Sequence, residues 1–172
     1  MPNHHHLVLG QADGFRRAFE LMTTAMRPRF ELPADMPVGA GPEVPANPQQ
    51  VQAMRDFGLL IVPSIVCLAF AVELILKTLL VQEGVLPDPT MPRPPRAPRG
   101  IHELDALFAA LPGVHADRIR AEVGGANFDA RLAEHAKTFT QWRYSFELQG
   151  VGADEDFLAA VFRAAREGVV LG

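Results

Sequence analysis

Residues 57–83 read FGLLIVPSIVCLAFAVELILKTLLVQE, and this stretch decides the fold. Most of it is apolar on every face of a helix, and such a helix in a soluble protein is surrounded by other helices. Asn47 and Pro48 suit an N-cap and a first helical position, because proline lacks an N–H that would be unsatisfied there anyway. Gly84 suits a C-terminal cap. We therefore predict one long central helix over residues 48–83.

The same stretch has a second interpretation as a membrane span. Its continuous apolar run, residues 57–72, contains Pro63 and is followed by Glu73 and Lys77. A spanning helix needs about 20 consecutive apolar residues, so we predict no membrane insertion. Proline removes a backbone hydrogen bond and clashes with the preceding turn, so we expect a kink or a break at Pro63.

Apolar residues recur every three or four positions in five further segments, which indicates amphipathic helices. These segments are residues 11–27, 102–111, 115–123, 128–148 and 154–166. Two proline-rich segments, residues 28–48 and 85–100, are predicted to be loops, because a residue before proline is pushed away from α geometry. No alternating pattern typical of a β-strand runs for more than about four residues.

Length and composition predict a single domain. The chain has 172 residues, 48% of them hydrophobic and 21% charged, which is close to the average of globular proteins and excludes a largely disordered chain. We predict one all-α domain over residues 1–172. Its expected architecture is an up-and-down bundle of about five to six helices around the long central helix.

Charge and cysteine content limit partners and compartment. A net charge of −4 argues against a protein that coats nucleic acid through its overall charge. Arg93, Arg96 and Arg99 form a local basic cluster, for which a solvated extended loop is favoured over a phosphate-binding arm. The lone Cys67 is typical of a small buried hydrophobe in a reducing compartment, and no secretory signal is recognisable at the N-terminus. We expect a cytoplasmic protein.

The sequence predicts neither a metal site nor a cofactor. It contains no glycine-rich phosphate loop, no paired cysteine motif and no Ser/His/Asp arrangement at an informative spacing. Three adjacent histidines at residues 4–6 are interpreted as an incidental feature of a frayed terminus.

A charged pair ends the apolar helix. Glu73 and Lys77 are four residues apart and share one helical face. In one interpretation they form an ion pair where the helix reaches water, worth only a few tenths of a kcal/mol. In the other, Glu73 lies where charge is costly to bury and pairs with an arginine from a facing helix.

A dense set of aromatic and polar side chains occupies residues 141–147, QWRYSFE. Arg143 follows Phe139 by one helical turn, and because Phe139 belongs to the apolar stripe we expect Arg143 to point partly inward. A guanidinium there requires a carboxylate or a bound anion, and Glu73 is the candidate. The predicted binding residues are Glu73, Lys77, Arg143, Tyr144 and Glu147.

Three short motifs follow one another between residues 69 and 147: AFAVELILKTLL at residues 69–80, HELDALF at 102–108 and FTQWRYSFE at 139–147. In residues, order and spacing they resemble bacterial HEPN-domain proteins. The resemblance implies a helical bundle that is often dimeric. It also implies membership of a superfamily that contains metal-independent ribonucleases of toxin–antitoxin and defence systems as well as non-catalytic binding members.

The catalytic pattern of the nuclease members is incomplete here. Those members use an arginine that holds a phosphate, followed after four to six residues by a histidine that acts as acid or base. Arg143 matches the arginine, but the positions expected to hold histidine are Leu148, Gln149 and Gly150. The pattern therefore favours a binding member over a nuclease.

Two hypotheses on function follow. The first is a HEPN-like binding or regulatory module, expected to be a homodimer, that engages an antitoxin-like partner protein, a nucleotide or an RNA through a polar patch around Arg143 and Glu73. The second is a metal-independent endoribonuclease in which Arg143 binds phosphate and His102 or His135 transfers the proton. Alternatively, His102 is a structural residue, because its place before Asp105 suits a helix cap.

Overall fold

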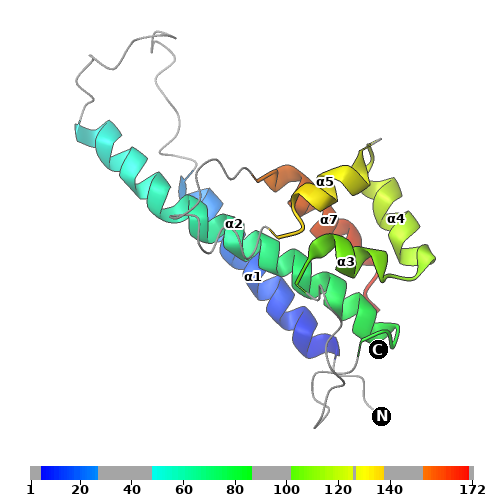
Figure 1. Ribbon diagram of the computed structural model, residues 1–172. Coiled ribbons are helices and arrows are strands. Elements are labelled where there is room, and N and C mark those ends of the chain that lie inside the picture. The colour runs from blue at the N-terminus through cyan, green and yellow to red at the C-terminus, as the bar shows by residue number, and fades with distance from the viewer. Residues whose placement is uncertain (1–4, 27–47, 87–101, 126, 138–152, 171–172) are drawn as a thin grey trace.

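The computed structural model describes residues 5–26, 48–86, 102–125, 127–137 and 153–170, with only the backbone described for residues 49–51 and 53–58. Every regular element in these ranges is an α-helix, and no β-strand occurs in them. The helices are α1 (His5–Met26), α2 (Pro48–Gln82), α3 (Leu104–Ala109), α4 (Gly113–Val123), α5 (Phe128–Glu134) and α7 (Glu155–Glu167). The prediction of an all-α helical bundle is confirmed (Figure 1).

Helix α2 forms the centre of the bundle. Its second half is covered on nearly all faces, and Val72, Ile75 and Leu79 are fully buried. The predicted bounds of this helix are confirmed to within one residue. Gly84 ends the turn that follows with a φ of 71°, the left-handed geometry that glycine adopts without a steric penalty.

The sequence predicts a kink or a break at Pro63; α2 runs as one α-helix from Pro48 to Gln82, so no break occurs there, and a kink stays a prediction. The stretch Leu59–Gln82 is long and apolar enough to cross a membrane by length and composition alone. However, much of that stretch is buried inside the protein, including all of residues 71–76, as in the core helix of a soluble protein. The fold is therefore compatible with a soluble protein.

Helix α1 lies antiparallel along one side of α2, and the rings of Phe15 and Phe70 meet edge to face at 4.7 Å between centroids (Figure 1). The helix begins six residues earlier than the sequence predicts. His5 at its start is buried, and its Nε2 atom lies 3.0 Å from the carbonyl oxygen of Val170 near the other end of the chain. This long-range contact holds the first turn of α1, which the apolar periodicity of the sequence did not predict.

Helices α3 and α7 pack on the other side of α2, with α4 against α7 and α5 against α3 (Figure 1). Aromatic rings join α5 to its neighbours: Phe128 of α5 lies 5.0 Å from Phe108 of α3 and 5.5 Å from Phe157 of α7, between ring centroids. Asp154 caps α7 by accepting a hydrogen bond from the backbone N–H of Phe157. This small cluster joins three short helices that are too short to be stable alone.

The predicted long helix over residues 128–148 is wrong in its first half, because α5 ends at Glu134 and residues 135–137 form a turn. The rest of that prediction lies outside the described residues. The turn is stabilised from elsewhere in the fold, since the carbonyl oxygen of Ala136 accepts a hydrogen bond from the backbone N–H of Leu104 at 3.0 Å. A hydrogen bond to a distant segment therefore forms at the turn that follows α5.

Candidate functional site

The carboxylate of Glu73 is the centre of the candidate site. Its side chain has no exposed surface, although it lies on the apolar helix α2. One oxygen, Oε1, accepts a hydrogen bond from Nζ of Lys77 at 2.6 Å and contacts Nδ1 of His102 at 2.9 Å. Burial of a carboxylate is costly unless it is paired, so these two contacts hold the charge in place. The ion pair with Lys77 that the first interpretation expects is formed, and the carboxylate is buried as the second expects.

The second oxygen of Glu73, Oε2, is buried and has no hydrogen-bond partner among the described residues. An unsatisfied buried acceptor costs about 1–3 kcal/mol, and more when it is charged. A donor at this position would remove that cost. The sequence predicts Arg143 for this role, and Arg143 lies outside the described residues.

His102 connects the buried carboxylate to the surface. Its side chain is 61% exposed, and its Nδ1 atom faces Glu73. The carboxylate only accepts hydrogen bonds, so we assign the proton on this side to Nδ1, which directs Nε2 toward the surface. The predicted capping role of His102 is wrong, because the N-cap of α3 is Glu103 and no side chain caps this helix.

The turn after α5 lies beside the start of α3. Besides the backbone bond between Leu104 and Ala136, Nζ of Lys137 lies 3.4 Å from Oε1 of Glu103. Three segments distant in sequence therefore meet around His102. We call Glu73, Lys77, His102, Glu103 and Lys137 together the polar patch.

His135, the second candidate histidine, has a different environment. It is buried against α7, with its ring 5.9 Å from that of Phe157, and Nε2 accepts a long 3.4 Å hydrogen bond from the backbone N–H of Asp154. Burial lowers the pKa of His135, and the nearby Asp154 carboxylate opposes that effect. A buried neutral ring with an occupied Nε2 is suited to packing more than to proton transfer.

We predict that His135 makes the protein less stable below neutral pH. Because the folded-state pKa is lowered, unfolding takes up a proton, and this residue's contribution is complete above about pH 6.5 and declines as the pH falls below it. The slope is at most about 1.4 kcal/mol per pH unit for one proton. Urea unfolding should show that the free energy of unfolding differs less between pH 7 and pH 5 in His135→Gln than in the wild type. The exposed His6→Gln serves as control and should keep the wild-type difference.

The remaining predicted site residues, Arg143, Tyr144 and Glu147, lie outside the described residues, so their contact with Glu73 stays a prediction. Within the described ranges, no group of three His, Cys, Asp or Glu side chains could hold a metal ion. Cys67 is half-buried beside the core, and burial raises the pKa of its thiol.

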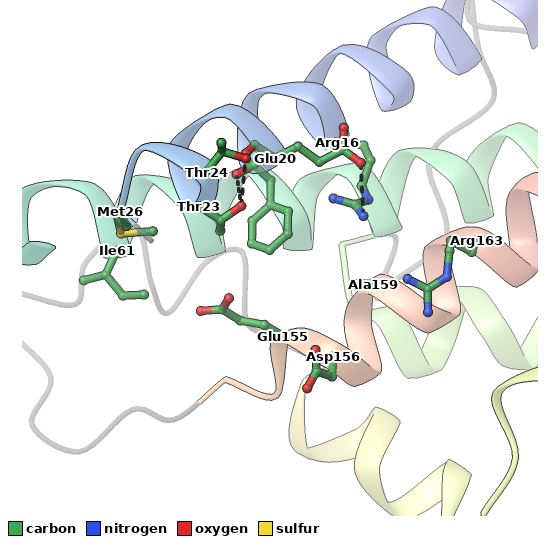
Figure 2. A pocket seen from close by; sticks show the side chains of 11 residues that line it. Arg16, Glu20, Thr23, Thr24, Met26, Ile61, Glu155, Asp156, Ala159 and Arg163 are labelled. Atoms are coloured by element: carbon green, nitrogen blue, oxygen red, sulfur yellow. Dashed lines mark hydrogen bonds and ion pairs between the residues drawn. The ribbon is translucent and has the colours of Figure 1, made fainter. Parts of the chain in front are cut away.

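A groove of about 600 Å³ between α1 and α7 was not predicted from the sequence (Figure 2). Its walls carry charged groups that include Arg16, Glu20, Glu155 and Arg163. Residues 16 and 163 are far apart in sequence, and each belongs to an ordinary amphipathic pattern. No local signal could have shown that they line one groove.

Comparison with known proteins adds no relative: no family model, no curated protein and no solved structure matches the chain.

Proposed function

We propose that the protein is a HEPN-type binding module that holds a phosphate-bearing ligand, a nucleotide or an RNA, at the polar patch. The observation that carries this proposal is the buried Glu73 carboxylate, which positions Lys77 and the exposed His102 beside each other. The Glu73 carboxylate is enclosed, whereas the groups that it holds are potential cations and donors, and the partly exposed Glu103 carboxylate is paired with Lys137. Such an arrangement suits an anion at the surface.

The predicted position of Arg143 supports the same ligand class. A guanidinium at the unsatisfied Oε2 of Glu73 would add a planar set of donors, and arginine is well suited to bind phosphate. We further propose that the protein is a homodimer, as the HEPN resemblance implies, and that it is cytoplasmic, as its single cysteine favours. An antitoxin-like protein that covers the same patch would regulate access to it.

A metal-independent endoribonuclease is the second candidate, and one observation favours it. A buried carboxylate that holds Nδ1 of an exposed imidazole is an arrangement that orients histidine for proton transfer. In this alternative His102 supplies the acid or base, and Arg143 binds the scissile phosphate. The absence of histidine at positions 148–150 argues against it.

Fluorescence anisotropy with a labelled single-stranded RNA, and a separate titration with ATP, tests the binding proposal. We expect His102→Ala to weaken binding about tenfold, which corresponds to the loss of one hydrogen bond to a charged group. His115→Ala is the matched control, because His115 also contacts a carboxylate, Oε1 of Glu83 at 3.0 Å, but lies outside the polar patch. Equal affinity of the His102 and His115 variants, or no binding of either ligand, would contradict the proposal.

The same RNA, incubated in EDTA, separates the two candidates. Cleavage by the wild type that is lost in both His102→Ala and Arg143→Ala would establish the nuclease. Binding without cleavage, weakened in both variants, would establish the module.

A further inference from the structure

The groove between α1 and α7 has a charge pattern of its own. It is lined by apolar side chains, which include Phe19 of α1 and Ile61 of α2, and by charged side chains of α1 and α7. The volume of about 600 Å³ falls in the range of ordinary ligand sites. None of the groove residues belongs to the polar patch, so the groove can have a function separate from the one proposed above.

Positive charge collects at one part of the groove. Arg163 of α7 is exposed and has no hydrogen bond or ion pair within the described part of the chain. Arg16 of α1 lies opposite, as Figure 2 shows, with Nη2 3.3 Å from Oε1 of Glu20 and its guanidinium 5.1 Å from the ring centroid of Phe19. Glu20 pairs with Arg16, but no described carboxylate pairs with Arg163. This part of the groove can therefore bind an acidic group.

Negative charge collects at the start of α7, where Glu155 and Asp156 line the same groove (Figure 2). Burial, and then the charge of Asp156, raise the pKa of Glu155. Both causes favour the protonated form of Glu155 over the ionised carboxylate. A cation placed beside Glu155 would stabilise the ionised carboxylate. Glu155 and Arg163 are eight residues apart on one helix, a separation of about 12 Å at 1.5 Å per residue.

We propose that this groove binds an extended segment of a partner protein with a basic side chain four residues from an acidic one. Residues four apart in an extended chain point to the same side and lie about 13 Å apart, close to the separation of Glu155 and Arg163. The basic group would bind near Glu155 and the acidic group near Arg163. An apolar side chain midway between them would contact Phe19.

Calorimetric titration of the full chain with three blocked peptides tests this assignment. The peptides are Lys-Ser-Leu-Ser-Glu, Lys-Ser-Leu-Ser-Lys and Glu-Ser-Leu-Ser-Glu, each acetylated and amidated. The wild type should bind the Lys/Glu peptide about tenfold more tightly than either like-charged peptide, because only that peptide complements both ends of the groove.

Arg163→Glu should reverse the preference, so that this variant binds the Lys/Lys peptide most tightly. Arg163 is exposed and unpaired, so the variant should fold, as circular dichroism would verify. Arg120→Glu, which makes the same charge change on α4 outside the groove, should keep the wild-type order. Absence of a preference in the wild type, or an unchanged order in Arg163→Glu, would overturn the proposal. His102→Ala should not alter peptide binding, which distinguishes the groove from the polar patch.

Discussion

Lys77→Met is expected to lower the free energy of unfolding by about 3 kcal/mol. Glu73 has no exposed surface and Lys77 has little, with 17% of its side chain exposed. Removal of the ammonium group leaves a buried carboxylate with His102 as its one remaining partner among the described residues, and breaking a buried ion pair costs about 3–5 kcal/mol. We expect the lower end of this range, because the contact with His102 remains.

The double variant Glu73→Leu/Lys77→Met separates the cost of an unpaired charge from a loss of packing. Apolar side chains of similar size can replace a buried ion pair at little cost, so the double variant should lie within about 1 kcal/mol of the wild type. Lys137→Met breaks the exposed pair with Glu103 and should change stability by less than about 1 kcal/mol. Urea unfolding followed by circular dichroism measures all three. A double variant as unstable as Lys77→Met would show that packing, not charge, causes the loss.

Phe157→Ala is expected to be at least as destabilising, by about 3–5 kcal/mol. Phe157 is 2% exposed and contacts Phe128, His135 and the guanidinium of Arg131, which lies 4.3 Å from its ring centroid. Its removal leaves a cavity where α5 packs on α7. Because these helices are short and depend on packing, the cavity should loosen the packing of α3, α5 and α7 against one another.

Two variants calibrate this measurement. Phe157→Leu keeps most of the buried volume and should cost roughly half as much as the alanine variant. Val114→Ala removes an exposed apolar side chain and should stay within about 0.5 kcal/mol of the wild type. A Phe157→Ala loss no larger than that of Val114→Ala would contradict the assignment of Phe157 to the core.

The sequence was sufficient to predict the helices whose signals are local. The end of α2 at Gly84 and the acidic start of α7 depend on residues within one or two turns. Periodicity also predicted a buried centre, since a helix that is apolar all round has no face suited to water. The same reasoning identified Glu73 as an unusual residue, because a charge in an apolar run needs a partner.

Contacts between distant segments could not be predicted in this way. His102 was identified as a candidate, but its contact with Glu73 joins residues 29 positions apart and depends on how α3 lies against α2. The end of α5 at Glu134 likewise depends on Leu104, whose backbone N–H binds the carbonyl oxygen of Ala136. Helical periodicity continues through this point and gives no indication of it.

The sequence by itself determined that this protein is all-α, is built on one buried apolar helix and places a carboxylate within it. The tertiary structure decided which groups surround that carboxylate and that α1 and α7 form a charged groove. The reason is physical: helix formation and burial follow from side-chain spacing within a few residues, whereas a site requires atoms from separate helices to come within about 3 Å of one another. Only the packing of the helices sets those distances.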